Sequence, residues 1–109
     1  MGDPSASQLS EAMNLLWQKF LPQMEERVAT LQSAAVRLAS GSSLIAEEQS
    51  RAAAEAHKLA GVLGTFGLKE GTELAREAEV LFEGSLDAAP TARLREIAER
   101  LQAMIAGRG

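Results

Sequence analysis

Apolar residues recur every three or four positions along most of the chain, which is the spacing of one face of an α-helix. This pattern predicts a short helix over about residues 7–20 and a long helix that follows Pro22 and ends near Ser40. We expect the proline to separate the two, because it lacks an N–H donor and its ring clashes with the preceding turn. The apolar stripe through both helices is interpreted as core rather than as a partner-binding surface; it includes Trp17, Phe20 and Met24.

Three further helices are predicted over about residues 45–66, 69–83 and 90–106. Gly67 is expected to end the first of them in the left-handed conformation that glycine adopts at helix ends. Pro90 is expected at the first position of the last helix, where a missing N–H costs nothing. Short connections make sequential helices neighbours, so we predict an all-α fold, an antiparallel up-down four-helix bundle with a short additional N-terminal helix.

The chain is predicted to form a single helical bundle domain over residues 1–109, with residues 1–6 as a frayed leader. No strand-like alternation, internal repeat or long linker interrupts the helical pattern. Glutamates recur at helical spacing in the 69–83 helix, and we interpret them as a solvated helix face; they are Glu70, Glu73 and Glu77.

Composition and charge exclude several classes of partner. The net charge is −4 at pH 7 and there is no basic stripe, which argues against nucleic acid and anionic membranes. The absence of cysteine excludes disulfides and thiolate metal sites, and it fits a reducing compartment. No apolar run is long enough to span a membrane, and the first residues lack the pattern of a secretory signal. We therefore expect a cytoplasmic protein.

The single histidine, His57, lies off the apolar stripe of its helix. On a helical wheel the stripe centres between Ala52, Leu59 and Leu63, and His57 points about 140° away from that centre. A histidine satisfied within the core would lie on the stripe, so we expect this imidazole to be exposed.

The helical neighbours of His57 are all small. The positions three and four residues away, and one turn further on, hold only alanine or glycine: Ala53, Ala54, Ala60, Gly61 and Gly64. None can cover the imidazole, which leaves room for a bulky partner. A second interpretation is that Gly61 and Gly64 allow a neighbouring helix to approach closely, and both can hold at once.

Glu79 is the candidate partner of the imidazole. In a helical hairpin centred on residue 68, it lies at the same height as His57. A carboxylate that accepts the Nδ1–H of a histidine fixes the tautomer and leaves Nε2 as the nucleophile. The alternative is an ordinary surface glutamate that pairs with Arg76, three residues earlier.

The residue inventory favours a covalent carrier over an enzyme. There is no second histidine, no serine–base pair near His57 and no cluster of metal ligands, so a hydrolase or metal enzyme is disfavoured. The glycines lie along a helix and do not follow a strand, so the sequence does not predict a nucleotide-binding loop. One exposed histidine is enough to accept and pass on a group.

The segment HKLAGVLGTFG resembles the motif of histidine-containing phosphotransfer (HPt) domains, which is His-x-Leu-Lys-Gly followed six residues later by Gly. Four residues match at the same offsets: His57, Leu59, Gly61 and Gly67. The GTFG ending is most similar to the HPt-type phosphorylation domain of chemotaxis kinases. The order of the helices also fits, so the resemblance covers nearly the whole chain.

The resemblance implies a carrier in a two-component phosphorelay. It makes His57 the phospho-acceptor, Glu79 the residue that orients the imidazole, and Gly61 the space for the phosphoryl group and partner. It implies a response-regulator receiver domain, a sensor histidine kinase, or both as partners, with the chain as a monomer. The transfer chemistry would be completed by these partners, with Mg²⁺ bound to them and no cofactor on this chain.

One departure from the motif concerns the charge at the site. The usual lysine three residues after the histidine is Ala60 here, which leaves Lys58 and Arg76 as candidate binding cations. The lysine stem is long enough to reach the imidazole, although Lys58 is 100° around the helix. The departure keeps a second hypothesis open, a non-catalytic adaptor or degenerate HPt domain that docks a receiver or kinase without being phosphorylated.

Overall fold

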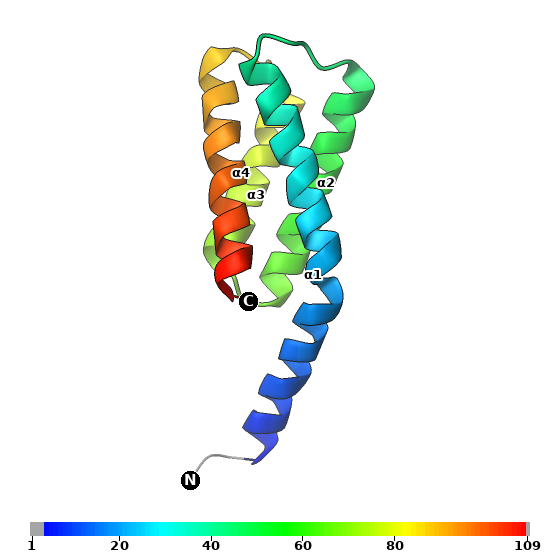
Figure 1. Ribbon diagram of the computed structural model, residues 1–109, viewed down its shortest axis with the longest axis vertical. Helices are drawn as coiled ribbons and strands as arrows, with labels where there is room; N and C mark the ends of the chain where they lie inside the picture. The colour runs from blue at the N-terminus through cyan, green and yellow to red at the C-terminus, as the bar shows by residue number, and fades with distance from the viewer. Residues whose placement is uncertain (1–3, 109) are drawn as a thin grey trace.

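The computed structural model describes residues 4–108, which form four helices and no strands (Figure 1). The helices are α1 (Pro4–Ala39), α2 (Ala46–Thr65), α3 (Lys69–Glu83) and α4 (Ala88–Arg108). The predicted all-helical fold is confirmed. Of the predicted frayed leader, residues 1–3 lie outside the described part of the chain, and residues 4–6 belong to the first turns of α1.

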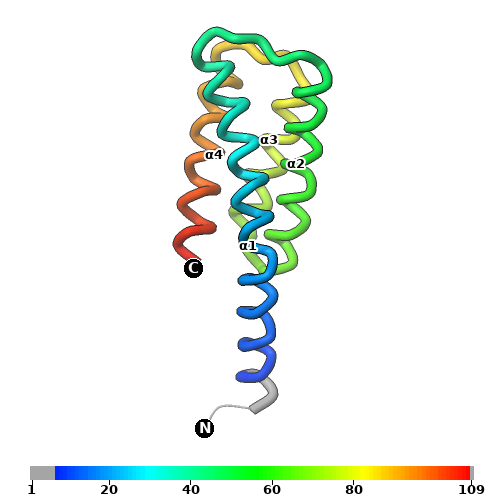
Figure 2. Tube along the Cα trace, turned by 45° about the vertical axis from the view of Figure 1, so that its right-hand side comes forward, coloured from blue at the N-terminus to red at the C-terminus, as the bar shows by residue number. Residues whose placement is uncertain are grey.

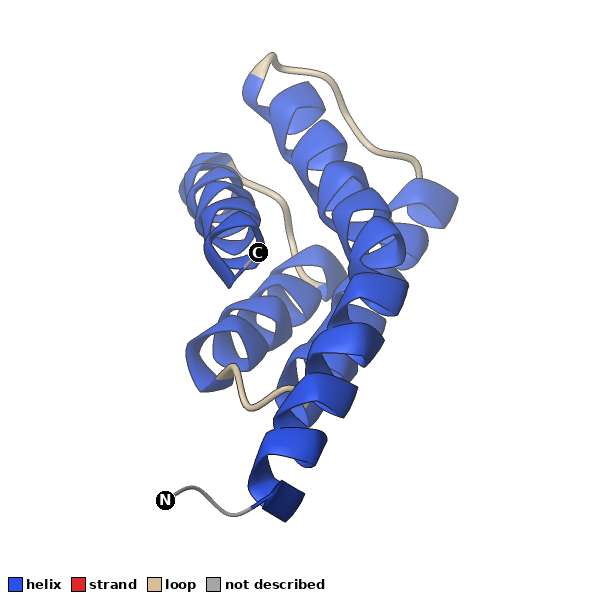
Figure 3. Cartoon of the chain, turned by 60° about the horizontal axis from the view of Figure 1, so that its bottom comes forward, coloured by secondary structure: helices blue, strands red, loops and turns tan. Residues whose placement is uncertain are grey.

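Successive helices run in opposite directions along the long axis of the molecule (Figures 1 and 2). The closest pairings join α2 to α3 and α1 to α4. Figure 3 shows that three loops connect the helices, with the lower part of α1 reaching past the other three. The bundle therefore consists of two tight helix pairs, and α2–α3 is one of them.

The predicted separate N-terminal helix is wrong, because α1 continues through Pro22 without a break. The apolar stripe keeps its helical spacing across the proline, with Trp17 on one side and Met24 and Val28 on the other, all buried in one core. Burying such side chains contributes about 1.5–3 kcal/mol each, which outweighs the roughly 3 kcal/mol cost of an interior proline. Pro22 itself is exposed, so its ring displaces no core side chain.

Glycine ends α2 as predicted. Gly67 adopts a φ of 72°, and two hydrogen bonds close the turn: the N–H of Gly67 donates to the Gly64 carbonyl at 3.0 Å and that of Leu68 to the Leu63 carbonyl at 3.0 Å. The chain reverses so tightly that α3 begins at Lys69. This turn fixes which residues of α2 and α3 face each other.

The last helix begins earlier than the sequence predicts. It starts at Ala88, so Pro90 is its third residue rather than its first. The shift has no cost in hydrogen bonding, because the first N–H groups of a helix have no partner within it. The first bond of α4 runs from the Thr91 N–H to the Asp87 carbonyl at 3.1 Å.

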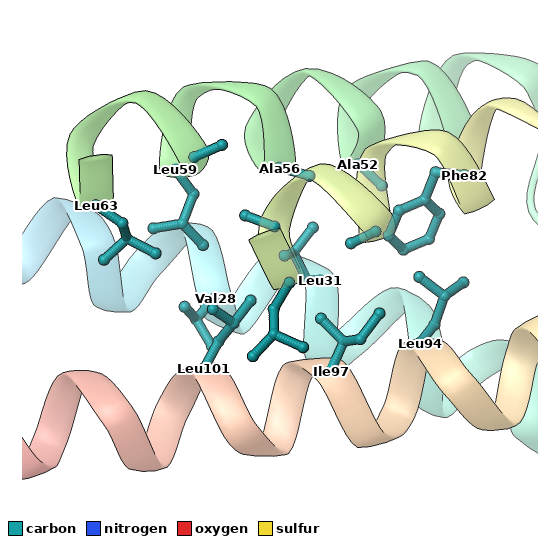
Figure 4. Packing of buried hydrophobic residues seen from close by; sticks show 14 of the residues in the cluster. Val28, Leu31, Ala52, Ala56, Leu59, Leu63, Phe82, Leu94, Ile97 and Leu101 are labelled. Atoms are coloured by element: carbon teal, nitrogen blue, oxygen red, sulfur yellow. The ribbon is translucent and has the colours of Figure 1, made fainter. Parts of the chain in front are cut away.

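Side chains from all four helices meet in one core, as Figure 4 shows for Leu31, Leu59, Phe82 and Leu101. Alanines at the contact between α2 and α3 allow the two backbones to approach closely; they include Ala52, Ala56, Ala75 and Ala78. The site residues of this pair therefore stand on a rigid support. Within residues 4–108, no helix combines the length and the apolar character that crossing a membrane requires.

Candidate functional site

His57 lies in the middle of α2 with its side chain 73% exposed. Its neighbours Ala56 and Leu59 are buried, which places the imidazole on the outer face of the helix. The exposure agrees with the helical wheel. An imidazole in this position is open to another molecule.

The carboxylate of Glu79, on α3, contacts the imidazole ring of His57. Nδ1 lies 3.1 Å from Oε2 and 3.2 Å from Oε1. A carboxylate accepts hydrogen bonds, so the contact suits the neutral tautomer that carries its proton on Nδ1, and in that tautomer Nε2 keeps its lone pair. The alternative pair of Glu79 with Arg76 does not form among the ion pairs of residues 4–108. The hairpin thus brings together the two residues that the count around residue 68 places at one height.

Two further cross-links, which the sequence analysis missed, hold α2 and α3 in register. The Gln49 amide donates to the carbonyls of Phe82 at 2.5 Å and Gly84 at 3.0 Å, at the end of α3. The Thr72 hydroxyl donates to the Ala60 carbonyl at 3.3 Å. These links lie on either side of the His57 contact. No local pattern predicts them, because each joins positions far apart in the sequence.

The small residues around His57 fall into two groups. Ala53 and Ala60 are buried between the helices, so they belong to the packing of α2 on α3. Gly61 lies on the open surface, and a Cβ added there would meet no atom within 4 Å. A Cβ on Gly64 would meet only the Thr72 hydroxyl, at 3.5 Å. Close approach of a helix therefore does not account for Gly61.

An open groove borders the imidazole on the side of the α2 N-terminus. Its walls are the first half of α2 and the last turns of α3, including Glu79 and Phe82. The α2 wall carries four small side chains, Ala46, Ser50, Ala53 and Ala54, together with Gln49 and Lys58. The groove leaves the imidazole open to a partner from this side.

The two candidate cations differ in their surroundings. Lys58 Nζ lies 3.7 Å from Glu55, which also accepts a 3.2 Å hydrogen bond from Arg27 on α1. Arg76 is exposed on α3 and forms no ion pair or side-chain hydrogen bond within residues 4–108. Lys58 therefore has an acidic neighbour on its own helix and also lines the groove beside His57, whereas the Arg76 guanidinium has no ion-pair partner within residues 4–108.

In the part of the chain that the structure describes, no group of three or more histidine, cysteine or acidic side chains is placed to hold a metal ion. The site consists of an exposed imidazole and the carboxylate that contacts it, on two closely packed helices.

Comparison with known proteins identifies the family. The family model described as the Hpt domain matches residues 15–107, which is most of the chain. No curated protein and no solved structure matches significantly. The Hpt family serves in general as histidine phosphocarrier modules of phosphorelays, which interact with kinases and receiver domains. With the match, the helical bundle and the motif around His57 in agreement, the chain belongs to the Hpt domain family.

Proposed function

We propose that this chain carries a phosphoryl group on Nε2 of His57 between a kinase or receiver aspartate and another receiver aspartate. The observation that carries the proposal is the exposed imidazole whose Nδ1 lies 3.1 Å from Glu79. Glu79 then orients the ring, while Gly61 and Gly64 leave room for the phosphoryl group and the partner.

The transfer step follows from this geometry. The Nε2 lone pair of neutral His57 attacks the phosphorus of an aspartyl phosphate, an N–P bond forms, and the P–O bond breaks as the carboxylate leaves with its electron pair. The Nδ1 proton stays in place, so the positive charge of the phosphorylated ring faces the Glu79 carboxylate. The partner contributes Mg²⁺ and the remaining stabilisation of the transition state, and this chain contributes a positioned nucleophile.

Several finer predictions belong to the same proposal. The partners are a response-regulator receiver domain, a sensor histidine kinase, or both, and the chain acts as a cytoplasmic monomer. The similarity to the phosphorylation domain of chemotaxis kinases rests on the GTFG ending. The cation that binds the phosphoryl group is Lys58 or Arg76.

The test uses phosphoramidate, a small donor whose P–N bond breaks with loss of ammonia. We expect the protein to acquire an acid-labile, base-stable phosphoryl group, and His57→Gln to abolish it. The label is followed by ³¹P NMR, and its transfer to an added receiver domain gives the second half of the cycle. A label that persists in His57→Gln would contradict the assignment.

A second candidate function is docking without phosphorylation. Ala60 in place of the family lysine favours it, because the site then has one cation fewer. This function predicts that the wild-type protein takes no label, while wild type and His57→Gln bind a receiver equally. Labelling of the wild type would exclude it.

A further inference from the structure

We propose that Arg76, presented by α3, is the residue that binds the phosphoryl group on His57 and replaces the lysine absent at position 60. The proposal rests on the proposed function, since it concerns the phosphorylated state of the same site. It distinguishes Arg76 from Lys58, which lines the groove beside His57 but is paired with Glu55.

The register of the α2–α3 pair places Arg76 at the same height as Ala60. His57 contacts Glu79 at one height, and Gly64 lies against Thr72 at another, where an added Cβ would be 3.5 Å from the hydroxyl. The two helices are antiparallel, so at successive heights the residue number rises from 57 to 64 on α2 while it falls from 79 to 72 on α3. Position 60, three residues after the histidine on α2, therefore lies at the height of position 76, three residues before the glutamate on α3.

The surface of α2 beside Ala60 is open. Ala60 is 5% exposed and its side chain ends at Cβ, so it places no atom over the site. Gly61 beside it has no heavy atom within 4 Å of an added Cβ. Arg76 stands three residues, roughly 4.5 Å, from Glu79 along α3, which is within the span of an arginine side chain. Its guanidinium fork matches the oxygens of a phosphoryl group.

The charges explain why a cation is needed here and which one serves. A phosphoryl group on Nε2 adds about two negative charges, while Glu79 already faces the Nδ1 proton. Lys58 lies 3.7 Å from Glu55, so it must leave an acidic partner to reach the phosphoryl group. Arg76 has no such partner to leave, because it forms no ion pair within residues 4–108.

The experiment compares matched variants, each labelled with phosphoramidate and followed by ³¹P NMR. We expect Arg76→Gln to slow phosphorylation and to speed loss of the label, each by about five-fold, and Lys58→Gln to change either rate by less than about two-fold. Arg76→Lys keeps the charge and retains most of the rate. Raising the salt from about 0.1 M to about 1 M should reduce the difference in phosphorylation rate between wild type and Arg76→Gln, because salt screens the charge of an exposed side chain.

The outcomes separate this inference from the proposed function. Wild type that takes no label overturns phosphoryl carriage itself. Normal labelling with Arg76→Gln equal to wild type, or with Lys58→Gln the slower variant, overturns only the role of Arg76. The role of Arg76 is also overturned if Arg76→Lys labels as slowly as Arg76→Gln and high salt does not reduce the difference from wild type. Such a loss of labelling rate would come from altered structure and not from the lost charge. Thermal unfolding of each variant checks that the bundle is intact.

Discussion

The two sides of α3 carry the same kinds of residue and use them differently. Toward α4, Glu77 accepts two hydrogen bonds from Arg93, at 2.5 and 2.8 Å, and Glu70 pairs with Arg100. Toward α2, Glu79 meets only the exposed imidazole of His57. The glutamates at 77 and 79 are two positions apart, so a short step along one helix separates a structural ion pair from the candidate site.

The residue that each glutamate contacts, Arg93 for Glu77 and His57 for Glu79, accounts for the difference between the two sides. The hydrogen bond from Arg93 lowers the pKa of Glu77, and the Glu77 carboxylate raises the pKa of Arg93. Each charge stabilises the other, and the guanidinium of Arg93 has no lone pair with which to act as a nucleophile. His57 differs because its second nitrogen stays unoccupied when Nδ1 contacts Glu79, so the same carboxylate chemistry leaves a nucleophile.

The largest effect is expected from Glu79→Ala. Removing the carboxylate frees the tautomer and orientation of His57, so phosphorylation by phosphoramidate should slow by roughly ten-fold. The imidazole is 73% exposed and Glu79 25% exposed, and a contact that is open to water on one side contributes little to stability, so the midpoint of thermal unfolding should change little. The measurements are the ³¹P labelling rate and a circular-dichroism melt.

Glu77→Ala is the matched control for that variant, since it removes the same side chain from the same helix. It should leave the labelling rate unchanged. Equal rate losses in the two variants would mean that the sides of α3 do not differ in the way that we infer. Glu79→Gln, which keeps an acceptor oxygen, should fall between Glu79→Ala and wild type.

The height of Glu79 relative to His57 could be predicted because it depends on local geometry. Gly67 closes a turn of standard form, and α3 starts two residues later, so counting outward from the turn gives the register. Exposure of His57 follows in the same way from helical periodicity. The functional roles of both residues stay predictions until phosphorylation is measured.

Features that depend on distant contacts could not be predicted. The acidic series lies on the surface as predicted, but Glu70 and Glu77 also pair with α4, and nothing near them in the sequence indicates Arg93 or Arg100. Continuity of α1 through Pro22 depends on core packing along the whole helix, which a local rule for proline does not include.

Gly71 and Gly61 differ in the same way, since one is packed between helices and the other lies on the open surface. A Cβ on Gly71 of α3 would lie 2.9 Å from Met104 Sδ on α4 and 3.0 Å from Leu63 Cδ1 on α2, whereas Gly61 is open. Gly71→Val should therefore destabilise the bundle by about 2 kcal/mol through overpacking, and Gly61→Val should change stability by less than about 0.5 kcal/mol. Urea unfolding measures both.

The same pair separates folding from docking. Gly61→Val should slow transfer between the protein and a receiver domain more than it slows labelling by phosphoramidate, because only the large partner needs the open surface. Equal losses of stability in the two valine variants would show that Gly61 is a packing position after all.

The smallest effect concerns Glu77→Gln and its dependence on pH. The pKa of Glu77 lies below its ordinary value of 4.5 because of the hydrogen bond from Arg93, so the ion pair contributes stability above about pH 4.5. That contribution is lost as the pH falls through the lowered pKa and the carboxylate takes up a proton. At pH 7 the variant should melt no more than about 4 °C below wild type, and the gap should close toward pH 3.

Labelling of His57 at pH 7 should be the same in Glu77→Gln and wild type, since the pair with Arg93 faces α4 and not the groove. A gap in melting temperature that persists at pH 3 would assign the effect to the packing of the Glu77 side chain rather than to its charge. A slower labelling rate would mean that the α4 side of α3 positions the imidazole. The melting temperature and the labelling rate together decide whether the Glu77–Arg93 ion pair stabilises only the bundle or also positions His57.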